Sequence, residues 1–218
     1  MDILHQNAEL LAVNKPPGIA AVPGGWRENE PSLIKILEEG YGKLWIVHRL
    51  DKVTSGVILF ARTAAAHRTL SLLFESGAVH KIYHAVVCGL PPWDEQTASH
   101  PLRVNVGHSH RTAVDHSRGK PSETWFRIRE RFEGYSLLEA RPLTGRTHQV
   151  RAHAAALGFP LAADTLYGAP ATDIIPRPAL HAFSLEFEFE GKPLSFTAPY
   201  PEDFKQTLAS LHIRMLAR

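Results

Sequence analysis

Short apolar runs, separated by turn residues, dominate the first part of the chain. Continuous or alternating apolar residues predict strands over residues 9–14, 44–47, 57–62 and 79–88. Apolar residues at helical spacing predict helices over residues 32–39 and 64–75, the second of them capped by Thr63. Turn signals such as Pro16-Pro17-Gly18 separate these elements.

The second part of the chain favours hairpins. Residues 123–132 alternate between apolar and charged side chains, and an apolar run over residues 135–140 returns after Gly134. Alternation reappears over residues 180–190, whereas residues 147–157 predict a helix that ends at Gly158.

Because hairpins outnumber strand–helix–strand units, we expect an α+β fold. Its sheet should be mixed and mostly antiparallel, with flanking helices. Residues 48–56 and 143–147 fall in loops that we expect to meet at a cleft. No repeat, low-complexity stretch or long linker interrupts the sequence, which favours a single domain over residues 1–218.

Composition narrows the class of protein. Apolar residues make up 44% and charged residues 21% of the chain, which is enough for an ordinary soluble core. Cys88 is the one cysteine, so no intrachain disulfide can form. We see no signal peptide at the N-terminus and no apolar run near the roughly 20 residues of a membrane span. We therefore expect a cytoplasmic protein, acting as a monomer.

Charge is distributed unevenly although the net charge is only +2. Residues 103–131 hold more bases than acids, namely Arg103, Arg111, Arg118, Lys120, Arg127, Arg129 and Arg131 against Asp115, Glu123 and Glu130. Such an asymmetry is typical of a face that binds a polyanion, with Arg111, Arg118 and Lys120 as candidate contacts. Solvated strand edges and loops would give the same pattern, so charge alone leaves both readings open.

The segment HRLDKVTSG, residues 48–56, is the strongest chemical signal. Asp51 lies in a polar break between two apolar runs, with Arg49 and Lys52 close by. A carboxylate beside fixed cations stays ionised, which suits a nucleophile or a base better than a general acid. An ordinary ion pair in a surface turn is the alternative.

A second signal is PLTGRTHQVRAH, residues 142–153. Thr144-Gly145 predicts a tight turn, and Arg146 stands just before a predicted helix, where it can pair a carboxylate bidentately. The alternative is that Thr147 caps the helix and Arg146 is solvated. Arg151, further along the helix, is a candidate RNA contact or a cover for the helix surface.

Tyr83 lies in KIYHAVVCG, residues 81–89, among apolar neighbours. A tyrosine offers a flat face to a nucleobase and a hydroxyl for a hydrogen bond, although core aromatics are far commoner. Thirteen histidines raise the question of a metal, but neither His108 with His110 nor His148 with His153 shows zinc-ligand spacing. We therefore expect no metal. We also expect no nucleotide cofactor, since no glycine-rich phosphate-binding motif is present.

Together these segments resemble the RluA-type RNA pseudouridine synthases. HRLDKVTSG resembles the family's catalytic motif, and KIYHAVVCG resembles the segment with its stacking tyrosine. The remaining matches are VNKPPGIAAVPG (13–24), RPLTGRTHQVRAHAAALGFPLAADTLYG (141–168) and ALHAFSLEF (179–187). One departure is Ala162-Ala163-Asp164, because the family more often has glycine before the aspartate. The start of the chain resembles the catalytic domain, without the S4-like domain of many relatives.

The resemblance implies a fold and a set of roles. Asp51 would act on a uridine so that the N1–C1′ bond breaks and the base rejoins through C5, giving pseudouridine. Whether Asp51 attacks C1′ or removes a sugar proton is open. Tyr83 would stack on the uracil and Arg146 would hold Asp51. Arg49 would fill the gap left by the flipped nucleotide, and His48 beside it is assigned to RNA contact.

The implied reaction is an isomerisation, so it requires no cofactor and no metal. The implied partner is RNA, either rRNA, tRNA or both. Two alternatives come from other classes of protein. One is an RNA-binding module with a dead site, which the presence of Asp51, Tyr83 and Arg146 disfavours. The other is a glycoside hydrolase, which normally needs a second carboxylate that the matching motifs lack.

Overall fold

The computed structural model describes residues 1–23, 31–107 and 111–216, and the chain forms two compact units. Unit 1 contains Met1–Lys81 and Ala182–Tyr200, and unit 2 contains Ile82–His181 and Pro201–Arg218. Each unit is therefore built from two separate stretches of chain. The sequence has no long linker at these boundaries, and a single domain over residues 1–218 stays a prediction.

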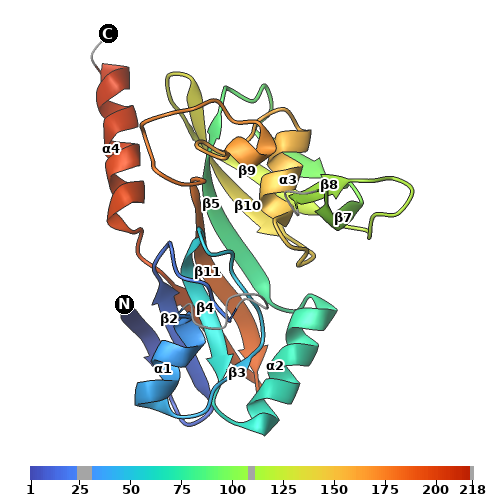
Figure 1. Cartoon of the computed structure of the whole chain (residues 1–218), viewed down its shortest axis with the longest axis vertical. Coiled ribbons are helices and arrows are strands. Elements are labelled where there is room, and N and C mark those ends of the chain that lie inside the picture. Colours follow the sequence, from blue (N-terminus) through green and yellow to red (C-terminus); the bar gives the residue numbers. More distant parts are fainter. Residues whose placement is uncertain (24–30, 108–110, 217–218) are drawn as a thin grey trace. The chain divides into compact units, whose positions relative to one another are not determined.

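Unit 1 is a sheet with two helices (Figure 1). Its strands are β1 (Asp2–Gln6), β2 (Leu10–Lys15), β3 (Trp45–Ile46), β4 (Ser55–Ala61), β11 (Leu180–Phe189) and β12 (Lys192–Thr197). Its helices are α1 (Leu33–Tyr41) and α2 (Ala64–Ser76). The strand order is β1-β2-β4-β11, with β3 beside β4 and β12 beside β11. The pairs β1–β2, β2–β4, β3–β4 and β11–β12 are all antiparallel.

Strand β4 forms the centre of unit 1. Each of its residues is buried, which explains its continuous apolar run, since a strand covered on both faces needs no polar alternation. Helix α2 packs Leu70 into a core that includes Leu59 and Phe187. The predicted cap is confirmed, because the Thr63 side chain accepts a hydrogen bond from the backbone N–H of Ala66 at 3.1 Å.

Unit 2 has a second antiparallel arrangement (Figure 1). The strands β5 (His80–Cys88), β10 (Tyr135–Pro142), β9 (Thr124–Arg131) and β6 (Glu95–Ala98) pair in that order. A separate pair consists of β7 (Leu102–Val106) and β8 (Arg111–Val114). The unit also contains α3 (Gln149–Ala156), the 3-10 helix η1 (Thr165–Tyr167) and α4 (Glu202–Leu216). The expected mixed, mostly antiparallel α+β fold is thus confirmed.

Helix α3 covers one face of the unit 2 sheet. Its Val150 and Ala154 pack into a core with Phe126, Leu138 and Ala85 from three strands. The predicted helix begins two residues too early, because His148 adopts a left-handed conformation, with φ of 54°, and Gln149 is the first helical residue. The predicted end agrees better, since the helix stops at Ala156 just before Gly158. In the described part of the chain, no helix is long and apolar enough to cross a membrane.

Candidate active site

The loop that carries Asp51 is closed by backbone hydrogen bonds. The Asp51 carbonyl accepts from the N–H of Thr54 at 3.0 Å, which turns the chain towards β4. Leu50 is buried and anchors the loop, whereas Arg49 is exposed and Asp51 is half-buried. The Asp51 side chain therefore stays partly accessible, close in sequence to an exposed cation.

The side chain of Lys15 donates hydrogen bonds to the backbone of this loop and of the NKPPG segment. It is fully buried, and its Nζ donates to the carbonyls of Pro16 at 2.9 Å and Lys52 at 3.2 Å. The Lys52 carbonyl also accepts from the N–H of Gly18 at 2.8 Å. The NKPPG motif and the Asp51 motif thus form one structure. Sequence reasoning missed Lys15, although a lysine in an otherwise apolar strand was a usable signal.

Gly56 fixes the far end of the loop. Its φ is +115°, and a Cβ there would lie 2.1 Å from the carbonyl oxygen of Ala182. A side chain at this position would collide with backbone of β11, which has little freedom to move. The glycine of the TSG sequence is therefore required for the close approach of β4 and β11 in unit 1.

His48 fixes the beginning of the loop. Its Nε2 accepts from the N–H of Leu59 at 2.9 Å, and its ring stacks on Phe74 with 4.5 Å between centroids. Burial lowers the pKa of His48 to about 3, and the charge of Lys81 adds to the effect. The ring is therefore neutral with its proton on Nδ1, since Nε2 must accept. These contacts give His48 a structural role, and its RNA contact stays a prediction.

The Arg146 segment, residues 143–148, is held against β9 by one buried amide. Gln149 Oε1 accepts from the Thr144 hydroxyl at 2.7 Å and from the Arg146 N–H at 3.0 Å. Its Nε2 donates to the Glu123 carbonyl at 2.8 Å and to the Thr124 hydroxyl at 3.0 Å. All four hydrogen-bonding positions of this amide are used, so the backbone at Arg146 is well fixed.

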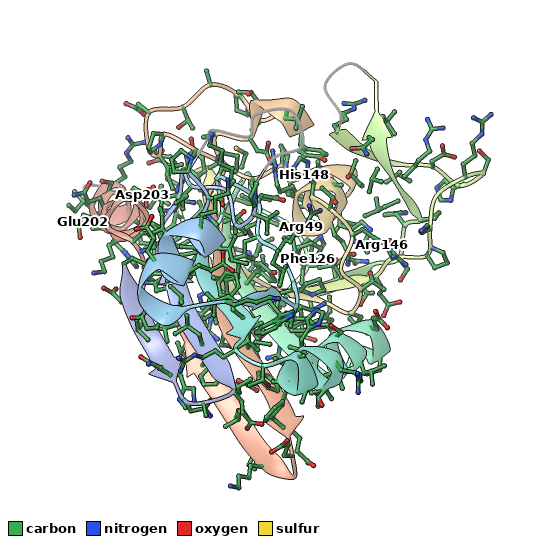
Figure 2. The ribbon with its side chains drawn as sticks, turned by 60° about the horizontal axis from the view of Figure 1, so that its bottom comes forward. Arg49, Phe126, Arg146, His148, Glu202 and Asp203 are labelled. Carbon is green, nitrogen blue, oxygen red and sulfur yellow. The ribbon has the colours of Figure 1, made fainter. Side chains whose placement is uncertain are left out.

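The side chain of Arg146 has spare hydrogen-bonding capacity. Its Nε is buried, and among the described residues it finds no hydrogen-bond partner. Figure 2 shows Arg146 and His148 on the segment that leads into α3. A buried guanidinium donor without a partner requires an explanation, and an incoming anion or carboxylate would supply the missing acceptor.

Ion pairs separate the bases of unit 2 into two groups. Four of those between residues 103 and 131 have acidic partners: Arg103 with Asp115, Arg127 with Glu95, Arg129 with Glu139, and Arg131 with Asp94. In the described part of the chain, the ion pairs do not include Arg111, Arg118 or Lys120, which are exposed. Within this region, the three residues predicted to contact RNA are thus those whose charge has no acidic partner among the described residues.

Arg151 is buried in an ion pair. It is 5% exposed, and its guanidinium binds the Asp164 carboxylate through Nε and Nη2, each at 2.7 Å. This bidentate pair gives Arg151 a structural role, and its RNA contact stays a prediction. Beside Asp164, Ala163 adopts φ of +61°. The turn therefore keeps the left-handed shape that the family's glycine favours.

Tyr83 lies on β5 opposite Ala140 of β10. Its half-buried ring packs against the apolar cluster that contains Val150 and Ala154 of α3. Tyr83 and α3 are therefore on the same face of the unit 2 sheet. Within unit 2 this face carries the aromatic ring and, at the start of α3, the Arg146 segment.

The predicted residues are divided between the two units. His48, Arg49 and Asp51 belong to unit 1. Those in unit 2 are Tyr83, Arg111, Arg118, Lys120, Arg146 and Arg151. The meeting of the two loops at one cleft stays a prediction.

The histidines with metal-like proximity in sequence have other partners. His153 is buried and contacts the Thr124 hydroxyl and the His100 carbonyl, whereas His148 contacts the Tyr167 hydroxyl. Within the described ranges, no three His, Cys, Asp or Glu side chains gather as metal ligands would. His108 and His110 lie outside the described residues, as does Gly24 of the N-terminal motif.

Comparison with known proteins gives a consistent result. Residues 9–156 match the model of the RNA pseudouridylate synthase family. The chain is 39% identical over 210 residues to an uncharacterized RNA pseudouridine synthase of Zymomonas mobilis, covering 93% of this chain and 94% of that protein. It is 36% identical over 204 residues to the dual-specificity RNA pseudouridine synthase RluA of Escherichia coli, covering 93% of each.

Solved structures agree. Human RNA pseudouridylate synthase domain containing 1 superposes with a TM-score of 0.76 at 30% identity, covering 91% of this chain and 83% of the human one. Human RNA pseudouridylate synthase domain containing 4 superposes with a TM-score of 0.80 at 23% identity, covering 96% of this chain and 92% of the human one. This second similarity supports the fold. This chain belongs to the RNA pseudouridine synthase family, a family of isomerases that act on RNA.

Proposed function

We propose that this protein converts specific uridines of rRNA, tRNA or both into pseudouridine, with Asp51 as the catalytic carboxylate. It acts in the cytoplasm as a monomer and needs no cofactor. The RluA relative is named as dual-specificity, which supports a substrate range of more than one RNA. RNA phosphates contact the uncommitted bases Arg111, Arg118 and Lys120.

The reaction moves one glycosidic bond. Asp51 attacks C1′ or removes a sugar proton, and in either case the N1–C1′ bond breaks and uracil leaves as an anion. The base turns within the site and bonds to C1′ through C5. C5 then loses its proton and N1 gains one, so that the product is an isomer of the substrate. No electron donor, acceptor or additional group takes part.

Three further residues support this step. The target nucleotide has to leave its stack, at a cost of a few kcal/mol, and Arg49 fills the space that it vacates. Tyr83 stacks on the uracil ring and keeps it bound while it turns. Arg146 pairs with the Asp51 carboxylate and holds it towards C1′.

The proposal rests on the hydrogen bonding of Arg146, in its backbone and in its side chain. Its backbone is fixed by Gln149, while the buried Nε of its side chain has no hydrogen-bond partner among the described residues. An arginine that only bound phosphate would have no need for a rigid backbone and a buried donor. A carboxylate partner uses both, since a bidentate pair depends on geometry.

The test is site mapping of pseudouridine in total RNA. RNA from a strain that lacks the gene is compared with RNA from the same strain carrying the wild-type gene or the Asp51→Asn variant. We expect at least one rRNA or tRNA site to disappear, to return with the wild-type gene, and to stay absent with Asp51→Asn. A site that Asp51→Asn restores to more than about a tenth would refute the role of Asp51. An unchanged map would refute the substrate assignment.

A further inference from the structure

Tyr167 joins β8 to the Arg146 segment. Its hydroxyl accepts a hydrogen bond from the backbone N–H of Thr112 at 3.0 Å, and it lies 3.1 Å from Nδ1 of His148. Because the Thr112 N–H can only donate, the phenol is free to donate its own proton to Nδ1. The tautomer of His148 with its proton on Nε2 would accept this hydrogen bond at Nδ1.

Thr112 makes a second tie to the same segment. Its hydroxyl donates to the carbonyl of Thr147 at 2.8 Å, and the residue is 1% exposed. Thr147 and His148 are the two residues that directly follow Arg146. One buried residue of β8 therefore holds both of them, the first directly and the second through Tyr167.

The held backbone is in an unfavourable conformation. His148 has φ of 54° and ψ of 20°, which is the left-handed region. For a residue other than glycine this costs on the order of 1–2 kcal/mol, and it persists only where neighbouring contacts enforce it. The ring of His148 also meets Tyr167 edge-to-face, with 5.9 Å between centroids. Tyr167 is thus one of the partners that hold His148 in this conformation.

The ring of Tyr167 packs against a buried ion pair. The Arg151 guanidinium lies over its ring at 5.0 Å, and Arg151 is fixed by its bidentate pair with Asp164. Burial raises the pKa of Tyr167, so the phenol keeps its proton at neutral pH. The chain of contacts runs from Asp164 through Arg151 and Tyr167 to His148.

We propose that Tyr167 is a positioning residue, which, together with Thr112, braces the backbone after Arg146 and so sets the direction of the catalytic arginine. The inference rests on the proposed function, in which Arg146 pairs with Asp51. Strand β8 then has two separate tasks. Successive side chains of a strand point to opposite faces, so the buried Thr112 braces the loop while its exposed neighbour Arg111 is available to RNA.

Tyr167→Phe removes the hydroxyl and keeps the ring beneath Arg151. We expect the single-turnover rate at saturating protein to fall about tenfold, as for the loss of one or two buried hydrogen bonds. RNA affinity should stay within about twofold, since no phosphate contact changes. Tyr135→Phe is the matched control, because Tyr135 contacts Thr172 through its hydroxyl at 3.1 Å in the same unit, away from the Arg146 segment.

A double-mutant cycle separates positioning from general loosening. If Tyr167 acts through Arg146, then Tyr167→Phe should slow the wild type but leave the residual rate of Arg146→Ala unchanged. An equal factor in both backgrounds would overturn the inference. So would a Tyr167→Phe rate within about twofold of wild type, when Arg146→Ala is clearly impaired. If Arg146→Ala itself is unimpaired, the proposed function of Arg146 fails instead.

A pair of Thr112 variants tests the second tie independently of Tyr167. Thr112→Ser keeps the hydroxyl that donates to Thr147, and Thr112→Val removes it at similar volume. We expect Thr112→Ser to keep the wild-type rate and Thr112→Val to lose about fivefold to tenfold. Equal rates for the two variants would show that β8 does not brace the loop through this hydrogen bond.

Discussion

The Gln149 side chain accepts a hydrogen bond from the backbone N–H of Arg146 at 3.0 Å while its amide nitrogen donates to the Glu123 carbonyl at 2.8 Å. The amide thereby joins the Arg146 segment to the start of β9. An amide suits this role, because its oxygen accepts while its nitrogen donates. The relationship explains the glutamine within TGRTHQ.

Gln149→Glu should therefore impair the enzyme strongly. A carboxylate would place an oxygen against the Glu123 carbonyl and bury a charge without a cation, at a cost of about 2–4 kcal/mol of folding stability. We expect a lower melting temperature and a lower turnover number, measured by thermal unfolding and single-turnover kinetics. The exposed Gln96→Glu on β6 is the control and should change neither. Wild-type stability in Gln149→Glu would contradict the role of this amide.

Arg146→Ala should reduce turnover far more than RNA affinity. The proposed partner of Arg146 is the Asp51 carboxylate, and loss of a charge-assisted pair costs roughly 1.5–3 kcal/mol, or about one to two orders of magnitude in rate. Filter binding and single-turnover product formation at saturating protein separate the two effects. A fall in affinity with an unchanged saturated rate would mean that Arg146 binds backbone phosphate.

Tyr83 replacements test which part of the side chain matters. Tyr83→Phe keeps the ring and should stay within about tenfold of wild type, whereas Tyr83→Leu loses base stacking worth roughly 1–3 kcal/mol. Pseudouridine formation on one transcript, measured under single-turnover conditions, gives the comparison. If the phenylalanine variant is as inactive as the leucine variant, the hydroxyl is essential and stacking alone does not describe the residue.

Patterns that are local in sequence predicted the fold well. The buried run of β4 and the cap at Thr63 each depend on neighbouring residues, and both agree with the structure. The hairpin of β9 and β10 agrees too. Strands β6, β7 and β8 were not predicted, because they are short and much of their surface is exposed, so their apolar pattern is weak.

The candidate site was predictable only as a set of motifs. The motifs pointed to Asp51 and Arg146, but some of the groups that support these segments come from elsewhere in the chain. Lys15 reaches the carbonyl of Lys52 across 37 positions, and no local pattern shows this. The ion pair of Arg151 was not predictable either: a helix arginine can face water or the interior, and only the position of Asp164 in the fold decides.

The low pKa of His48 predicts that the folded protein loses stability in acid. Its pKa is about 3 in the folded chain and about 6.5 when unfolded, so the unfolded state binds the proton more readily. Stability is complete above pH 6.5 and declines as the pH falls from there towards 3. Between pH 7.5 and 5.0 this one group should cost about 1–2 kcal/mol.

The variant His48→Gln isolates this contribution. A glutamine oxygen can accept from the Leu59 N–H but does not titrate. We therefore expect its free energy of unfolding, measured with urea, to fall less than that of wild type between pH 7.5 and 5.0. His84, whose pKa burial lowers to about 4, remains and contributes equally to both proteins. An unchanged pH dependence would show that the His48 ring takes up a proton as readily in the folded protein as in the unfolded chain.

Charge removal on the exposed side of β8 and the segment after it should weaken RNA binding without touching the chemical step. Arg111, Arg118 and Lys120 take part in no ion pair within the described part of the chain, so their charge is available to phosphate. In the variant with all three changed to alanine, we expect lower affinity and a flatter salt dependence, by roughly 0.7 of a log–log unit for each lost contact with single-stranded RNA. The single-turnover rate at saturating protein should match wild type, because the brace formed by Thr112 and Tyr167 is intact. Filter binding across a salt series measures the affinity and the salt dependence, and product formation measures the rate.

Tyr167→Phe should show the opposite result, with RNA affinity kept and the single-turnover rate reduced. If the triple variant keeps both its affinity and its salt slope, RNA binds another face of the protein and the charge argument fails, even where the enzyme assignment stands.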